Sequence, residues 1–325
     1  MHIAVLMVLA GIFLLIKGAD GLIVGATAIA RRFKVPPIVI GLTIVAFGTS
    51  LPELLVNVFS VWKGTTDLAV GNIIGSNIAN ILLIIGVSAV VWPLSVKRNT
   101  VWKEIPFAFL ASILVLVMAS DIVLTGKPAD MLDRIDGFAL LAFFVIFLYY
   151  AYGMRSEQGV PREETKQALE EAKSLTVSRA SGFIILGIAG LALGGSWTVD
   201  GAVTLATALG ISERIIGLTV VAIGTSLPEL VTSVMAALRR QADIAVGNVV
   251  GSNIFNVFWI LGISASVRTL PFSPGAGVDA LVAVAASFLF FVALFIGKRH
   301  HVDRWQGAAF VALYAAYLGS LAFRA

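Results

Sequence analysis

The sequence has no cysteine, only three histidines and few charged residues. Asp, Glu, Lys and Arg make up 13% of its 325 residues, against roughly 25% in a soluble domain. Without cysteine, disulfides and thiolate chemistry are excluded, and His2, His300 and His301 lie too near chain ends or loops for a mid-membrane zinc site. The basic net charge of +4 does not imply a nucleic-acid partner, because basic residues in membrane proteins mostly report topology.

Long hydrophobic runs are abundant. Hydrophobic residues make up 58% of the chain, and the mean hydropathy is +0.96. Runs of about 17–25 apolar residues are long enough to cross a bilayer, and nothing resembles the short alternating strands of a membrane barrel. The sequence therefore predicts an all-α integral membrane protein with ten transmembrane helices. They lie near residues 3–30, 38–62, 68–94, 102–120, 135–153, 180–208, 214–238, 244–267, 278–296 and 305–323.

An internal repeat organises the chain. The motif Gly-Thr-Ser-Leu-Pro-Glu occurs at 48–53 and at 224–229, and residues 41–89 match 217–265 without gaps at 27 of 49 positions. Each half holds five predicted spans, so the second half enters the membrane from the opposite side, as in inverted-repeat transporters. We expect a first membrane repeat at 1–153, a short linker at 154–178 and a second membrane repeat at 179–325.

The distribution of basic residues predicts the orientation. With both termini outside, 16 of the 23 Lys and Arg residues fall on inner segments and 6 on outer ones. Inner loops carry the excess of Lys and Arg in membrane proteins. The linker at 154–178 is therefore expected in the cytoplasm, and both termini outside.

Each copy of the motif places a carboxylate, Glu53 or Glu229, inside an apolar span. Ionisable residues at membrane depth are costly and indicate a functional site. The proline of each motif removes one backbone donor and breaks the helix, so hydroxyl, carboxylate and carbonyl oxygens come together, a combination that suits Na⁺ and Ca²⁺. Besides the two glutamates, the expected oxygen donors are Thr49, Ser50, Thr225 and Ser226, with the carbonyls of Ala46 and Ala222.

A second repeated motif follows each glutamate. Its two copies are GNIIGSNIAN at 71–80 and GNVVGSNIFN at 247–256. The four-residue spacing puts polar side chains on one helix face, and these neutral oxygens complete a cation shell without adding charge. The two stripes are Asn72, Ser76 and Asn80 in the first copy, and Asn248, Ser252 and Asn256 in the second.

Other polar residues inside the spans have a weaker pattern. Lys17 and Asp20 lie about one turn apart in the first span and are expected to pair with each other. Kinks and small-residue motifs are common in transmembrane packing. The coincidence of a kink, a buried glutamate and a polar stripe, all doubled, favours a single ion site over packing alone.

These motifs resemble those of the sodium/calcium exchanger branch of the cation/Ca²⁺ antiporter superfamily, whose two repeats carry GTSLPE and GSNxxN-like sequences. The short linker is similar to that of prokaryotic members. The resemblance implies that Glu53 and Glu229 are the central cation ligands and that broken helices 2, 3, 7 and 8 form the site. It also implies that Ser76, Asn80 and Ser252 of the polar stripes are ligands, together with the donors of the GTSLPE motifs. Many members carry an aspartate where this chain has Asn256.

The expected function is a secondary antiporter, not an enzyme, that exchanges Ca²⁺ for Na⁺ and contributes to calcium homeostasis. Its partners would be these ions and the lipid bilayer, without a cofactor, in the cell (inner) membrane of a prokaryote. A Ca²⁺/H⁺ exchanger, a K⁺-dependent exchanger and a passive cation channel remain alternatives. An intramembrane hydrolase is disfavoured because the chain has no cysteine and no central histidine. The sequence does not determine the oligomeric state.

Overall fold

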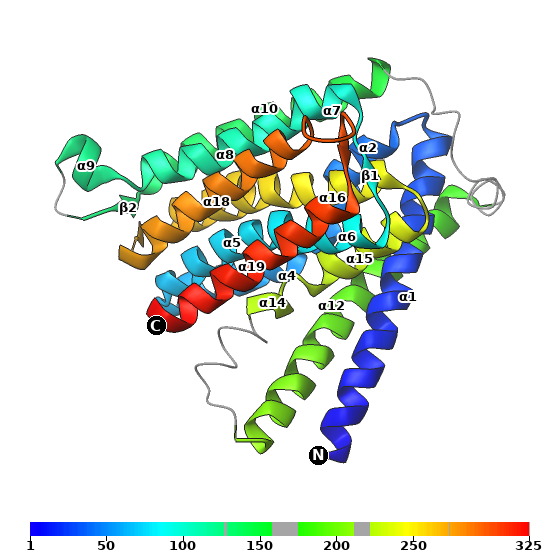
Figure 1. Ribbon diagram of the computed structural model, residues 1–325, viewed down its shortest axis with the longest axis horizontal. Helices are drawn as coiled ribbons and strands as arrows, with labels where there is room; N and C mark the ends of the chain where they lie inside the picture. Colours follow the sequence, from blue (N-terminus) through cyan, green and yellow to red (C-terminus); the bar gives the residue numbers. More distant parts are fainter. Residues whose placement is uncertain (127–128, 158–174, 211–221, 273, 325) are drawn as a thin grey trace.

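The computed structural model describes residues 1–126, 129–157, 175–210, 222–272 and 274–324, and these residues are almost entirely helical (Figure 1). The elements before the predicted linker are α1 (His2–Arg32), α2 (Pro37–Ile40), η1 (Gly41–Val45), α3 (Ala46–Thr49), α4 (Leu51–Lys63), α5 (Thr66–Ala79), η2 (Asn80–Ile85), α6 (Gly86–Val91), β1 (Leu94–Ser95), α7 (Arg98–Trp102), α8 (Glu104–Met118), α9 (Asp121–Thr125), β2 (Met131–Leu132) and α10 (Arg134–Glu157). The η elements are π-helical.

The elements after the linker follow a similar order. They are α12 (Val177–Ala208), α14 (Ala222–Gly224), α15 (Leu227–Leu238), α16 (Ala242–Ile254), η4 (Phe255–Leu261), α17 (Gly262–Val267), β3 (Leu270–Pro271), α18 (Pro274–Ala293), β4 (His301–Val302) and α19 (Arg304–Arg324). The predicted linker lies largely outside the described residues, as does the start of the predicted seventh span, at 214–221.

The helices are long and apolar enough for a membrane protein. Seven described helices meet the length and hydropathy of a membrane span, and the pair Pro37–Thr49 and Leu51–Lys63, bent by 46°, makes up to eight. The described part of the predicted seventh span, α15, is shorter, and the last predicted span coincides with the 21-residue α19. The all-α membrane class is therefore confirmed, while the inverted arrangement of ten spans stays a prediction.

Two of the helices predicted to be broken are continuous. The third and eighth spans run as Thr66–Val91 and Ala242–Val267, each with a π-helical segment in place of a break. Their motifs contain glycine but no proline, so every residue keeps its backbone donor and the helix widens locally without ending. The prediction of breaks is wrong for these two spans and right for the second.

α1 and α12 pack against each other along their length and extend away from the other helices (Figure 1). Their contact follows a line of glycines. A Cβ atom at Gly18 would lie 2.7 Å from the backbone nitrogen of Leu191, and one at Gly194 would lie 2.7 Å from the carbonyl oxygen of Gly11. Small residues let helix backbones approach closely in membranes, so this seam joins the first helices of the two halves.

The remaining helices surround α5 and α16, and short strand pairs join loops of the two halves. α8 packs against α18, and α6 packs against α19. Strand β1 pairs with β4, and β2 pairs with β3, each antiparallel. Of the span made by α16 and its continuation, 94% of the most apolar stretch is buried. For the span that begins with α5 the share is 78%. The two spans that carry the GNxxGSNxxN motifs are therefore the most buried of the described spans, and these polar motifs lie inside the protein.

Candidate ion-binding site

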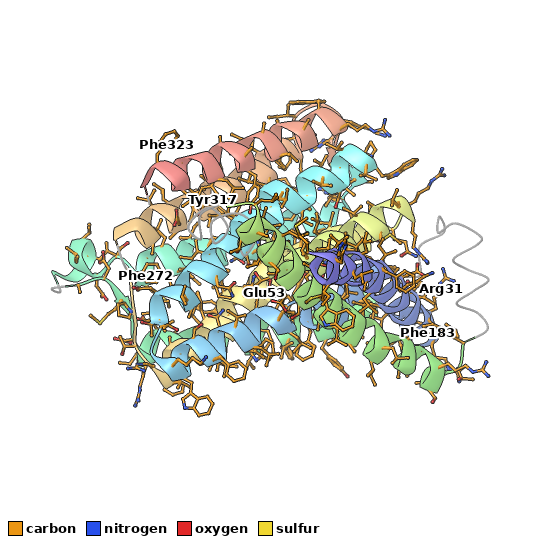
Figure 2. All side chains as sticks on the ribbon, turned by 90° about the horizontal axis from the view of Figure 1, so that it is seen from below. Arg31, Glu53, Phe183, Phe272, Tyr317 and Phe323 are labelled. Atoms are coloured by element: carbon orange, nitrogen blue, oxygen red, sulfur yellow. The ribbon has the colours of Figure 1, made fainter. Side chains whose placement is uncertain are left out.

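Both motif glutamates lie in the first turn of a helix that starts inside the core. Glu53 is in the first turn of α4 and Glu229 in that of α15, and each helix has its motif proline at its start. A proline in the first turn of a helix costs no hydrogen bond because the N–H groups of that turn have no partner within the helix. The positive end of the helix dipole faces these carboxylates and stabilises them. Both side chains are only 1% exposed, and Figure 2 shows Glu53 near the centre of the molecule.

The hydroxyls of each motif contact residues of the other half. Ser50 donates to Oε1 of Glu229 at 3.1 Å. Ser226 donates to the hydroxyl of Ser76 at 3.2 Å, and both of these serines lie beside the carboxyl of Glu53. Ser50 therefore bonds the carboxylate of the opposite motif directly, whereas Ser226 lies beside the carboxyl of the opposite motif, so the two motifs come together in one cluster.

The threonines of the motifs also cross between the halves. Thr49 donates to Oδ1 of Asn248 at 3.1 Å, and Thr225 donates to Oδ1 of Asn72 at 3.2 Å. The amide of Asn248 donates in turn to Ser233 at 3.0 Å. The side-chain oxygen of the first asparagine in each GNxxGSNxxN motif therefore accepts the threonine hydroxyl of the GTSLPE motif in the other half. These two bonds orient the threonine hydroxyls.

Several oxygen atoms in this buried cluster have no hydrogen-bond partner among the described residues. They are Oε2 of Glu53, Oε2 of Glu229, Oγ of Ser252, Oδ1 of Asn80 and Oδ1 of Asn256. Buried polar atoms are nearly always satisfied, and each exception requires an explanation. All of these atoms are oxygens with lone pairs, which are able to coordinate a cation. The set of carboxylate, hydroxyl and amide oxygens fits a hard cation such as Na⁺ or Ca²⁺.

The two carboxyl groups share one environment. They interact electrostatically with each other, and Thr49, Ser50 and Ser252 lie beside Glu229. Among the described residues, no group of three or more His, Cys, Asp or Glu side chains is placed to hold a metal. The charge of this site therefore comes from two carboxylates, and every further side-chain donor in it is neutral.

The carbonyl groups expected as donors differ between the copies. The carbonyl of Ala46 accepts the backbone N–H of Ser50 at 3.0 Å and the hydroxyl of Thr49 at 3.3 Å. In the second copy, the N–H of Ser226 goes to Ile223 at 3.1 Å, leaving the carbonyl of Ala222 without this bond. The Ala46 carbonyl is therefore already shared with two protein donors.

Two asparagines of the GSNxxN motifs belong to the cluster although the sequence did not single them out. Asn77 and Asn253 are buried and accept the side-chain amides of Asn256 and Asn80, at 3.0 Å and 2.8 Å. Each follows the middle residue of its stripe, Ser76 or Ser252, by one position. Helical spacing therefore assigns them to a different face of the helix from the stripe. The signal was their presence in both motif copies.

One expected ion pair is replaced by another. Asp20 of α1 pairs with Arg239 at the end of α15, while Lys17 is exposed on α1. The prediction that Lys17 and Asp20 pair is therefore wrong. The aspartate faces the neighbouring helix of the second half, which the spacing within α1 does not reveal.

Comparison with known proteins agrees with this geometry. The family model of sodium/calcium exchanger proteins matches residues 3–153 and 180–323. Over 96% of the chain and 97% of its relative, the sequence is 30% identical to the sodium/calcium exchanger MaX1 of Methanosarcina acetivorans. It is 36% identical to the inner membrane protein YrbG of Escherichia coli, over 89% of each.

A solved structure has the same fold. The sodium–calcium exchanger NCX_Mj, soaked with Na⁺, superposes with a TM-score of 0.81 at 36% identity, over 98% of this chain and 99% of that one. The family consists of transporters, and no enzymatic cofactor is evident in it. The chain therefore belongs to the sodium/calcium exchanger family, in the prokaryotic branch of the cation/Ca²⁺ exchangers.

Proposed function

We propose that this protein is a secondary antiporter that exchanges Ca²⁺ for Na⁺ at one site between Glu53 and Glu229. The observation that carries the proposal is the crossed contact of the motifs, in which Ser50 of the first copy bonds Glu229 of the second. A site shared between two halves opens to either side when one part of the bundle moves against the other. The relatives named for sodium and calcium point to the same two ions.

Charge balance favours this ion pair. Two carboxylates neutralise one Ca²⁺ or two Na⁺ without a further acidic group. Ca²⁺ takes six to eight oxygen ligands in flexible geometry, and the partnerless oxygens of Ser252, Asn80 and Asn256 provide neutral ones. Competition of both ions for the same two carboxylates would couple their fluxes.

The proposed architecture is an inverted repeat. Residues 1–153 would form the first membrane repeat, 154–178 a cytoplasmic linker and 179–325 the second membrane repeat, with ten spans and both termini outside. The cell (inner) membrane of a prokaryote is the proposed location. The crossed bonds of Thr49 with Asn248 and of Thr225 with Asn72 agree with a pseudo-twofold axis through the site.

A Ca²⁺/H⁺ exchanger is the second candidate. The observation behind it is that each glutamate, 1% exposed, keeps one oxygen without a hydrogen-bond donor, and a proton is able to occupy that oxygen. We favour sodium because the hydroxyls of Ser50, Ser76 and Ser226 surround the carboxyls, and a bound proton has no need of hydroxyl ligands.

The test is uptake of ⁴⁵Ca²⁺ into proteoliposomes with sodium, potassium and proton gradients varied one at a time. We expect uptake when Na⁺ is loaded inside, and little when K⁺ replaces it. Uptake that follows the pH gradient and ignores Na⁺ would establish proton coupling instead. Uptake that needs K⁺ together with Na⁺ would indicate the potassium-dependent type, and flux without any counter-ion would indicate a channel.

A further inference from the structure

Four buried asparagines form a reciprocal amide network beside the proposed site. They are Asn77, Asn80, Asn253 and Asn256. Nδ2 of Asn80 donates to Oδ1 of Asn253 at 2.8 Å, and Nδ2 of Asn256 donates to Oδ1 of Asn77 at 3.0 Å. Both bonds join α5 or its continuation η2 to α16 or its continuation η4, so each half of the chain holds an amide of the other.

The network fixes which end of each amide is available. An asparagine side chain carries an NH₂ donor at one end and a carbonyl acceptor at the other. Oδ1 of Asn80 and Oδ1 of Asn256 have no hydrogen-bond partner among the described residues. With the NH₂ group bound across the helix interface, the unpartnered end is in both cases the oxygen, which is the end that coordinates a cation.

The unpartnered oxygens lie on the face that carries the site. Asn80 follows Ser76 by four residues, and Asn256 follows Ser252 by four, so each pair shares one helix face. Ser76 lies beside the carboxyl of Glu53, and Ser252 beside that of Glu229. Each asparagine also lies at the start of a π-helical segment, η2 or η4, a feature that often occurs at functional sites.

We propose that Asn77 and Asn253 are positioning residues that hold the amides of Asn256 and Asn80 with their oxygens toward the transported cation. This inference rests on the proposed function, because it assumes that the cation binds between Glu53 and Glu229. Each motif copy thereby orients the neutral ligand of the opposite copy. Without the acceptor, the NH₂ group is free to turn toward the ion, where its partial positive charge opposes binding.

The proposal predicts a specific pattern of coupling between residues. Asn77→Leu keeps a side chain of similar size and removes the acceptor of Asn256. We expect it to raise the KM for Ca²⁺ about 5-fold, the effect of losing one hydrogen bond between two neutral groups, with the maximal uptake rate little changed. In an Asn256→Ala background the same substitution should have no further effect on KM, because it acts only through that amide.

The matched control combines Asn77→Leu with a substitution of the asparagine that Asn77 does not bond. In an Asn80→Ala background, Asn77→Leu should keep its full effect, since Asn80 is held by Asn253. The mirrored cycle of Asn253→Leu with Asn80→Ala repeats the test in the other copy. Ser264→Ala, a buried residue later in the same span as Asn253, is the control for packing, and its KM should equal that of the parent protein.

The measurement is ⁴⁵Ca²⁺ uptake into sodium-loaded proteoliposomes over a range of Ca²⁺, with folding checked by size-exclusion chromatography and thermal unfolding in detergent. If Asn77→Leu does not fold, the cycle of Asn253→Leu with Asn80→Ala tests the positioning role instead. An unchanged KM in Asn77→Leu, or additive effects of Asn77→Leu and Asn256→Ala, would overturn the positioning role. If transport fails in Glu53→Gln while Asn256→Ala leaves KM unchanged, this inference falls and the proposed site stands. If Glu53→Gln transports normally, the proposed site falls first.

Discussion

The two copies of the repeated sequence agree near the glutamates and differ at the ends of the same helices. In the centre, Thr49 and Thr225 each donate to the first asparagine of the opposite copy. At the helix ends, Arg239 of the second copy pairs with Asp20, whereas Lys63, which aligns with Arg239, has no ion pair among the described residues. The two copies therefore make equivalent contacts in the centre, where both contribute to the candidate site. They make different contacts at the helix ends, where each copy has different neighbours.

A smaller difference lies within the motifs themselves. Ser50 donates to the carboxylate of Glu229, while Ser226 donates to the hydroxyl of Ser76. The backbone bond just before each helix also differs, since the N–H of Ser50 reaches back four residues and that of Ser226 three. One sequence motif thus adopts two related geometries, and substitutions at equivalent positions test how far they are equivalent in transport.

The largest expected effect comes from neutralising one glutamate. Glu53→Gln and Glu229→Gln should each lower Ca²⁺ uptake about 30-fold or more. Each removes the negative partner of the bound cation, and removing one partner of a buried pair of opposite charges typically costs about 2–5 kcal/mol. Uptake by sodium-loaded proteoliposomes measures both. Equal losses would support a symmetric site, and full transport by either variant would contradict the assignment of that glutamate.

Removing the serine of each GTSLPE motif should affect the KM for Ca²⁺ differently in the two copies. Ser50→Ala deletes a hydrogen bond to a carboxylate, which is worth about 1.5–3 kcal/mol, whereas Ser226→Ala deletes one to a hydroxyl, worth about 1 kcal/mol. We therefore expect the KM for Ca²⁺ to rise roughly 10-fold or more in Ser50→Ala and about 5-fold in Ser226→Ala. Identical values would show that the two serines bind the ion equivalently during transport. The control is Ser88→Ala, at a buried serine of α6 outside both motifs.

The smallest effect should come from the ion pair at the helix end. Arg239→Gln removes the partner of Asp20, a pair whose side chains are 26% and 36% exposed. Exposed pairs contribute about 0–1 kcal/mol, so the free energy of unfolding in detergent should change by no more than this. Lys63→Gln should have no effect. Chemical unfolding in detergent compares them, and an equal loss in both variants would show that Lys63 has a partner of its own.

Much of this protein was predictable from its sequence. Hydropathy gave the membrane class because apolar runs of span length have no other stable environment. The doubled motifs predicted a functional role for Glu53 and Glu229, because an ionisable group at membrane depth needs a functional reason, and the structure places both glutamates in one buried cluster. The proline of the first motif correctly predicted the bend of 46° before α4, since a missing backbone donor interrupts a helix wherever the helix lies.

The contacts between helices were decided only by the tertiary structure. Helical spacing shows which side chains share a face, but it does not show which residue of another helix they meet. Asp20 therefore bonds Arg239 and not its neighbour Lys17. Asn77 and Asn253 orient amides across the interface although they stand outside the polar stripe. The repeated motifs thus predicted which residues the candidate site contains, because residue type and spacing are written in the sequence. The contacts between α5, α16 and their continuations decided which of its oxygen atoms have no hydrogen-bond partner among the described residues.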